Sequence, residues 1–121
     1  MTRTVPPNAP PAAAPVLQPV ALKPTQIVSA LASIPGWVLS GDGADVCIEK
    51  SWTFPHLQAA MAFANAVAWI AEQLNHHPEL MVSYRRCTVR WQTHDVQGLS
   101  SLDFAAAQAL EKQLFPAPDA A

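Results

Sequence analysis

Apolar side chains recur at spacings of three and four along residues 56–75, near the middle of this chain of 121 residues. On an α-helix that spacing forms one broad apolar face, and such a face has to be buried against another layer of structure. The predicted face consists of Leu57, Ala60, Met61, Ala64, Val67, Ala68, Ala71 and Leu74. Asn75 favours a left-handed helix end, and Pro78 cannot continue a helix. The sequence therefore predicts one long helix that ends near residue 75.

Two pairs of short runs with strand character flank this helix. Residues 36–40 and 46–54 precede it, joined by the turn-rich segment 41–45, and residues 80–84 and 87–93 follow it. The last run alternates apolar and polar side chains, which is typical of a strand that is buried on one face only. Each pair is therefore predicted to form an antiparallel hairpin.

Two shorter helices complete the predicted elements. Residues 24–34 begin with a proline, which suits a first helical turn, and are followed by Pro-Gly, which ends a helix. Ser100 and Asp103 have the spacing of a capping box, which predicts a helix that runs to about Leu114. The predicted order is α-β-β-α-β-β-α. That order favours an α+β fold with a four-stranded antiparallel sheet and three helices on one face.

The two ends of the chain differ in composition from its middle. Seven of the 12 prolines fall within residues 1–24. Proline removes a backbone donor and blocks helix formation, so residues 1–22 are predicted to form a disordered, Pro/Ala-rich tail. The same prolines interrupt every candidate signal peptide, and no apolar run has the length of a membrane span. We therefore expect one folded domain over residues 23–115, a second short disordered tail over 116–121, and no membrane partner.

The charge balance and the cysteines narrow the class of partner. The formal net charge is -2, and the longest basic run is the pair Arg85-Arg86. This composition argues against nucleic acid and anionic lipid as partners, and it favours a small molecule or a protein. Cys47 and Cys87 lie far apart and form no CxxC motif, so neither a zinc knuckle nor a thioredoxin-type site is expected. Such cysteine usage favours a reducing, cytoplasmic location.

Three of the four histidines form a candidate cluster. His76 and His77 are adjacent in the sequence, and His94 lies at the end of a predicted strand. Histidine titrates near neutral pH, so a cluster of this kind points to proton-transfer chemistry. Glu72 lies four residues before His76, so their side chains are neighbours on one surface of the predicted helix, where the carboxylate can orient the imidazole and favour its protonated form. The sequence therefore predicts a site where the long helix ends.

Each of these residues also has a purely structural interpretation. His76 and His77 would be favoured at a helix C-terminus by the helix dipole alone, and the capping box alone would account for Asp103. Tyr84 and Trp91 are most simply aromatic residues of a core or an interface. A metal site is not expected, because adjacent histidines do not share a helix face and no strong third ligand is suitably spaced. Nucleophilic catalysis is poorly supported, because neither cysteine adjoins the histidines in sequence.

The joint pattern is more specific than its parts. It reads Glu72-x3-His76-His77-Pro78-x5-Tyr84-x9-His94-x8-Asp103, with Thr93 before the last histidine and Gly98-Leu99-Ser100 after it. Over roughly residues 24–114 this pattern resembles the signature of the pterin-4a-carbinolamine dehydratase family. The resemblance implies a hydro-lyase that converts 4a-hydroxytetrahydrobiopterin to quinonoid dihydrobiopterin and water. That reaction recycles the cofactor of aromatic amino-acid hydroxylases and requires no metal or redox cofactor.

The resemblance also implies roles for individual residues. His76, His77 and His94 would be the catalytic and pterin-contacting residues. Residues that bind substrate or support the histidines would be Glu72, Pro78, Tyr84, Thr93 and Asp103. As a hypothesis, one of His76 and His77 is the acid at the leaving hydroxyl, and His94 contacts the opposite side of the pterin ring.

The partners implied by the resemblance are a pterin substrate, a second copy of the chain in a homodimer or homotetramer, and a functional link to phenylalanine hydroxylase. Members of this family are also known as dimerisation cofactors of a homeodomain transcription activator. The competing prediction is therefore a non-enzymatic oligomeric binding or assembly module. Ala59, Ala62 and Ala66 lie outside the main apolar face of the long helix, which suggests a subunit contact there. All typed positions of the motif are present, which favours the enzyme.

Overall fold

The computed structural model describes residues 19–116, so most of the two predicted tails lies outside the described residues. The helices and strands are α1 (Pro24–Leu31), β1 (Val38–Ser40), β2 (Cys47–Thr53), α2 (Leu57–Leu74), β3 (Glu79–Ser83), β4 (Arg86–Trp91) and α3 (Ser101–Leu114). Two 3₁₀ turns, Gly43–Asp45 and His94–Val96, follow β1 and β4. This order confirms the predicted α+β fold.

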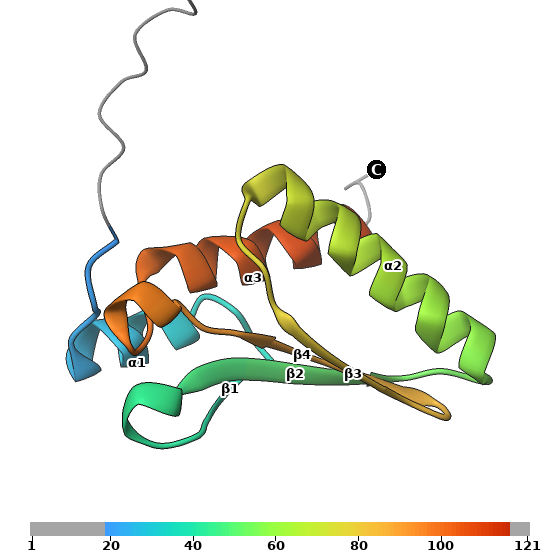
Figure 1. Cartoon of the computed structure of the whole chain (residues 1–121), viewed down its shortest axis with the longest axis horizontal. Coiled ribbons are helices and arrows are strands. Elements are labelled where there is room, and N and C mark those ends of the chain that lie inside the picture. The colour runs from blue at the N-terminus through green and yellow to red at the C-terminus, as the bar shows by residue number, and fades with distance from the viewer. Residues whose placement is uncertain (1–18, 117–121) are drawn as a thin grey trace, which may run out of the picture.

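The four strands form one antiparallel sheet in the order β1-β2-β4-β3. The second strand of each predicted hairpin therefore lies at the centre of the sheet, where Ile48 of β2 is paired with Trp91 of β4. Helices α2 and α3 lie next to each other across one face of the sheet, and α1 packs at the end of the same layer (Figure 1). The opposite face carries polar pairs such as Ser51 and Thr88, whose hydroxyl oxygens are 2.7 Å apart.

The hydrophobic core lies between the sheet and the helices. Its fully buried members include Ile48, Val89 and Trp91 from the sheet, with Val67 from α2 and Leu110 from α3. Burying one large aliphatic side chain contributes about 1.5–3 kcal/mol, so the contact between these two layers dominates the stability of the fold. Within residues 19–116, no helix is both long and apolar enough to cross a membrane.

The predicted apolar face of α2 is wrong in part, although the helix itself is confirmed. Its buried residues are Ala60, Phe63, Ala64, Val67, Ile70 and Ala71. Leu57 and Met61 are each 46% exposed, Leu74 is 41% exposed, and Ala68 is exposed as well. The helix is apolar over most of its circumference, so its sequence pattern does not determine which side faces the sheet. The sheet takes the side that carries the large residues Phe63 and Ile70.

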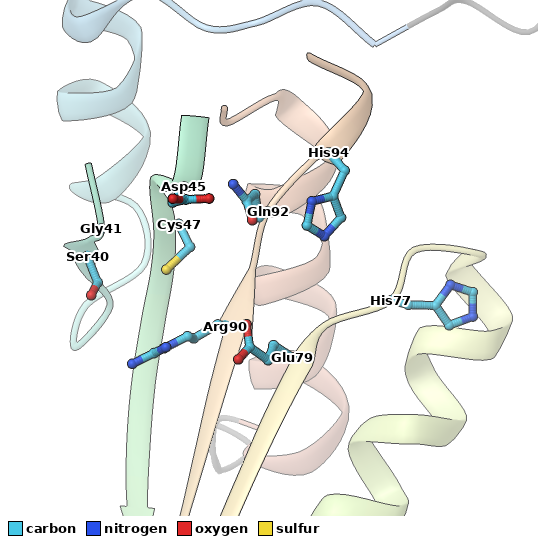
Figure 2. Close-up of a pocket in the computed structure, with 9 residues that line it drawn as sticks. All are labelled: Ser40, Gly41, Asp45, Cys47, His77, Glu79, Arg90, Gln92 and His94. Atoms are coloured by element: carbon cyan, nitrogen blue, oxygen red, sulfur yellow. The ribbon is translucent and has the colours of Figure 1, made fainter. Parts of the chain in front are cut away.

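The end of β4 also differs from the prediction, and this difference shapes the site. The predicted strand 87–93 ends at Trp91, and Thr93 forms only an isolated bridge with Gly98. Between these two residues the chain makes the tight turn His94–Val96, and Gln97 adopts a left-handed conformation with φ 51°. The turn places His94 at the rim of the sheet, beside the segment that follows α2 (Figure 2).

Candidate active site

The C-terminal end of α2 determines the directions of His76 and His77. Asn75 has the left-handed angles φ 51° and ψ 39°, as the sequence predicts, and the His76 amide donates to the Ala71 carbonyl over 3.2 Å. This closing turn satisfies carbonyl groups that the helix end leaves without partners. It also takes His76 out of the helical register.

The predicted pairing of Glu72 with His76 is wrong for that reason. The i, i+4 neighbour relation holds only while the helix continues, and the left-handed residue Asn75 stands between the two. Glu72 Oε1 lies 3.2 Å from His77 Nε2 instead, and both of these side chains are largely exposed.

His76 is bound to Asp103 of α3. The distance from His76 Nε2 to Asp103 Oδ1 is 2.7 Å, the carboxylate is 0% exposed, and the imidazole is 13% exposed. The other carboxylate oxygen, Oδ2, accepts hydrogen bonds from the Ser100 amide at 2.9 Å and from the Thr93 hydroxyl at 2.8 Å. Asp103 therefore closes the predicted capping box and orients a histidine at the same time.

These contacts fix the orientation of the His76 ring. A carboxylate can only accept, so Nε2 carries the proton that is donated to Asp103, and Nδ1 is left for a ligand. The fully buried Trp91 ring stacks on the imidazole with centroids 5.5 Å apart and planes 11° apart. His76 is thus a preorganised residue with one free nitrogen.

The three histidines line one hollow of about 510 Å³. His76 and His77 come from the segment after α2, and the exposed His94 comes from the turn after β4. The remaining lining residues are Pro19, Leu74, Asn75, Gln92, Thr93, Asp95 and Leu102. Ligand pockets of 300–1,000 Å³ hold drug-sized molecules, so this hollow has room for a bicyclic heteroaromatic compound.

A second, smaller hollow of about 260 Å³ shares His77, Gln92 and His94 with the first. Its other lining residues are Ser40, Gly41, Asp45, Cys47, Glu79 and Arg90. Figure 2 shows that they come from β1, β2, β3, β4 and the connection between β1 and β2. His77 and His94 therefore stand where the two hollows meet.

Not every predicted site residue joins this constellation. Tyr84 lies in the turn between β3 and β4, is 68% exposed, and has the Arg85 guanidinium 5.2 Å from its ring centroid. At about 3.3 Å per residue, the length of β3 separates Tyr84 from the histidines. Glu72 borders a shallow hollow with Trp69 on α2 and touches the site only through His77. Pro78 is half-buried and leads the chain from His77 into β3.

Other residues of the site were not predicted to be there. Trp91 was interpreted as a core or interface aromatic, and it is both a core residue and the stacking partner of His76. Gln92 borders both hollows, and the signal for it in the sequence is its place two residues before His94, since residues two apart share one face of an extended strand. Asp45 is brought in by the sheet, and nothing in its local sequence marks it, whereas Glu79 stands two residues after His77.

The two cysteines are free and buried. Cys47 borders the smaller hollow, so it is near the histidines in space although not in sequence. Burial raises the pKa of the Cys47 thiol, and the nearby Glu49 carboxylate raises it further. Burial likewise raises the pKa of the Cys87 thiol. A protonated thiol is a poor nucleophile, so the raised pKa values argue against nucleophilic catalysis by either cysteine. Within residues 19–116, no group of three or more His, Cys, Asp or Glu side chains could hold a metal ion.

Comparison with known proteins gives a consistent family. A family model described as "Pterin 4 alpha carbinolamine dehydratase" matches residues 20–113. A protein of Paracidovorax citrulli named "Putative pterin-4-alpha-carbinolamine dehydratase" is 50% identical over 94 residues, which cover 78% of this chain and 81% of the relative. A protein of Dechloromonas aromatica with the same name is 46% identical over 84 residues, which cover 69% of this chain and 71% of the relative.

A solved structure agrees with this assignment. The crystal structure of a transcriptional coactivator/pterin dehydratase from Brucella melitensis superimposes with a TM-score of 0.68 at 30% identity. The match covers 75% of this chain and 95% of that one. Fold, motif and sequence similarity agree, and the chain belongs to the pterin 4 alpha carbinolamine dehydratase family.

Proposed function

We propose that this protein dehydrates 4a-hydroxytetrahydropterins, with 4a-hydroxytetrahydrobiopterin as the reference substrate. The observation that carries the proposal is the convergence of His76, His77 and His94 on one hollow, with His76 held by the buried Asp103. Family membership and the names of the relatives support the same reaction.

The chemistry is an elimination of water. The bond from C4a to the hydroxyl oxygen breaks, the proton on N5 is lost, and a double bond forms between C4a and N5. The products are quinonoid dihydropterin and water, and no electrons are exchanged with another molecule. The step therefore needs an acid at the hydroxyl and a base at N5, each of which contributes roughly 10²–10⁴-fold to the rate.

The histidines supply both functions in this proposal. One of His76 and His77, in its imidazolium form, protonates the leaving hydroxyl, and a neutral histidine takes the proton from N5. His94 contacts the opposite side of the ring. Asp103 and Thr93 act through His76, because the carboxylate binds its Nε2 and the threonine hydroxyl binds the carboxylate. Such a chain of hydrogen bonds keeps a proton on Nε2 and fixes the orientation of the ring before substrate arrives.

The biological role that follows is cofactor recycling. An aromatic amino-acid hydroxylase such as phenylalanine hydroxylase releases the 4a-hydroxy compound, and the dehydrated product is ready for reduction. The reaction balances without a metal or a redox group, so we propose that the protein uses neither.

A second candidate function is an oligomeric binding or assembly module. Helix α2 exposes Leu57 and Met61 at 46% each and Trp69 at 71%, and exposed apolar side chains of this size favour a subunit contact. The printed description of the Brucella melitensis protein includes transcriptional coactivator. We propose that the chain forms a homodimer or homotetramer and that this oligomer carries the enzyme activity. The same oligomer would then serve either candidate function.

The test is the decay of freshly generated 4a-hydroxytetrahydrobiopterin, followed by ultraviolet absorbance with the native protein, with a His76→Ala/His77→Ala variant, and with buffer alone. The proposal predicts acceleration by the native protein only, while circular dichroism shows both proteins folded. If the native protein does not exceed the spontaneous rate, the enzyme proposal is wrong, and the assembly module becomes the better account.

A further inference from the structure

The hydroxyl of Ser100 is buried beside the site and makes two hydrogen bonds. Ser100 is the N-cap residue of α3 and is 0% exposed. Its oxygen accepts from the Leu102 amide over 3.2 Å and lies 2.7 Å from the hydroxyl oxygen of Thr93. Thr93 lines the histidine hollow, whereas Ser100 is not among the lining residues. Ser100 therefore supports the site from within the protein and does not border the ligand space.

The direction of the bond between Ser100 and Thr93 follows from their other partners. The Asp103 carboxylate only accepts, so the single hydroxyl proton of Thr93 is donated to Asp103 Oδ2 over 2.8 Å. Toward Ser100 the Thr93 oxygen can then only accept, and the Ser100 hydroxyl is the donor. The bonds run in one direction, from the Leu102 amide through both hydroxyls to the carboxylate that accepts from His76.

Burial makes this chain of bonds sensitive to the loss of one member. Asp103 is 0% exposed and Thr93 is 4% exposed, so bulk water does not stand ready to replace a lost protein donor. A buried polar group that loses its partner keeps the cost of its desolvation. Without the Ser100 hydroxyl, the Thr93 oxygen loses its donor and its side chain loses the contact that fixes it. The bond from Thr93 to the carboxylate is then weakened, since linked hydrogen bonds strengthen one another.

The same bond closes the base of the loop that carries His94. The loop leaves β4 through Thr93 and reaches the start of α3 at Ser100. Its ends are joined twice, because the Thr93 amide donates to the Gly98 carbonyl over 3.0 Å and the two hydroxyls bond over 2.7 Å. The loop therefore has a fixed base. The Ser100 hydroxyl thus contributes to the positions of both His76 and His94.

We infer that Ser100 is a positioning residue of the dehydratase. Its hydroxyl fixes the Thr93 side chain, which holds the Asp103 carboxylate against His76. The same bond fixes the base of the loop that carries His94. The inference rests on the proposed dehydratase function. Because Ser100 does not border the hollow, the loss of its hydroxyl should lower kcat and leave KM close to the native value.

The test separates the hydroxyl from the helix cap, since Ser100 supplies both. Ser100→Ala removes both, whereas Ser100→Gly removes the hydroxyl but leaves a residue that is a good N-cap. Ser100→Thr keeps both. His56→Ala is the matched control, because the His56 imidazole caps α2 by accepting from the Ala59 amide and does not border the histidine hollow. For each protein kcat and KM are measured on 4a-hydroxytetrahydrobiopterin, and Tm is measured by circular dichroism.

Activity is expected to follow the hydroxyl, and stability is expected to follow the cap. In Ser100→Ala and Ser100→Gly kcat should fall by about three- to tenfold, the factor that corresponds to one neutral hydrogen bond. Ser100→Thr should restore kcat to near the native value. Tm should fall clearly in Ser100→Ala and much less in Ser100→Gly. His56→Ala should keep the native kcat even where its Tm falls.

Thr93→Val gives a second comparison, because it breaks the same chain one bond nearer to Asp103. Both residues act through one carboxylate, so Ser100→Ala should lower kcat much less in a Thr93→Val protein than in the native protein. If Ser100→Ala does not fold, Ser100→Gly takes its place in both comparisons.

The inference is wrong, with the dehydratase intact, if Ser100→Ala keeps the native kcat or if Ser100→Thr is as slow as Ser100→Ala. It is also wrong if kcat follows Tm, so that Ser100→Gly is as active as the native protein, or if the losses in Ser100→Ala and Thr93→Val are additive. If the native protein does not accelerate dehydration, the proposed function is wrong, and the role of Ser100 is wrong with it.

Discussion

Asp103 joins three parts of the chain through one buried carboxylate. It accepts hydrogen bonds from the Ser100 amide at the start of α3, from the Thr93 hydroxyl after β4, and from the His76 imidazole after α2. The cap at the start of α3 therefore holds the carboxylate at the place where the His76 imidazole reaches it.

Asp103→Asn tests this role of the carboxylate. The amide nitrogen of asparagine can only donate, and it cannot face the Ser100 amide, which is a donor as well. The nitrogen therefore faces His76 Nε2 and drives the histidine to the other tautomer. We expect dehydration to fall by about 10²–10⁴-fold. The measurement is kcat/KM on 4a-hydroxytetrahydrobiopterin, with thermal unfolding as a check on the fold.

Glu111→Gln is the matched control, since it makes the same exchange on the same helix. Glu111 binds Lys50 and the Trp37 indole and does not border the histidine hollow. Native activity in Glu111→Gln beside a strong loss in Asp103→Asn supports the account. If Asp103→Asn retains activity within about twofold of the native protein, the account is wrong on this point. Loss of an acid or base lowers the rate by about 10²-fold or more, so such a result would show that His76 does not need Asp103 to act.

At the scale of elements, the site depends on how two elements end. Helix α2 ends at the left-handed Asn75, and β4 ends in the turn His94–Val96. The first end separates the directions of His76 and His77, and the second brings His94 beside them. A change in the residue at which α2 or β4 ends would therefore move a histidine without altering the core.

Asn75→Ala tests the helix end. Alanine in a left-handed conformation costs about 1–2 kcal/mol, because its Cβ approaches the following carbonyl, so the free energy of unfolding should fall by that amount. For a domain of this size, 1 kcal/mol corresponds to a decrease in Tm of roughly 4–8 °C.

The control for this prediction is Asn75→Gly, since glycine adopts the left-handed region freely. Chemical denaturation should therefore place Asn75→Gly near the native protein and Asn75→Ala clearly below it. Equal stability of the two variants would mean that the conformation at residue 75 does not limit the fold.

The sequence predicted this helix end and the fold because both depend on local chemistry. Asn75 and Pro78 mark the end of α2, and the alternation along residues 87–93 identifies the buried side of β4. The partner of Glu72 could not be predicted, because the left-handed residue Asn75 changes the direction of the backbone and of the side chains that follow it. Asp45 could not be recognised either, because only the strand order β1-β2-β4-β3 brings it beside the histidines.

At the scale of the whole molecule, the fold separates its surfaces. The helical layer exposes apolar residues of α2, and the two hollows that meet at the histidines lie at the edge and on the open face of the sheet. A subunit contact through α2 can therefore form without covering the face on which the smaller hollow lies.

Trp69→Glu tests the proposed assembly. Trp69 is 71% exposed on α2, and a charge at the centre of an apolar interface is costly to bury. We expect the variant to sediment as a smaller species than the native protein while its circular dichroism is unchanged. Gln113→Glu on the exposed side of α3 adds the same charge elsewhere and should retain the native size. Identical sedimentation of all three proteins would show that α2 does not form the contact.

The most direct test of the central claim, that the histidine hollow is the active site, is a crystal structure of the protein with a stable pterin such as 7,8-dihydrobiopterin. The account predicts the pterin ring in the hollow bordered by His76, His77 and His94, within hydrogen-bond distance of at least one of these imidazoles. A larger hollow of about 690 Å³, lined by Ile34, Pro35 and Phe115 among others, is the competing location. A pterin bound there, with the histidine hollow empty, would contradict the account.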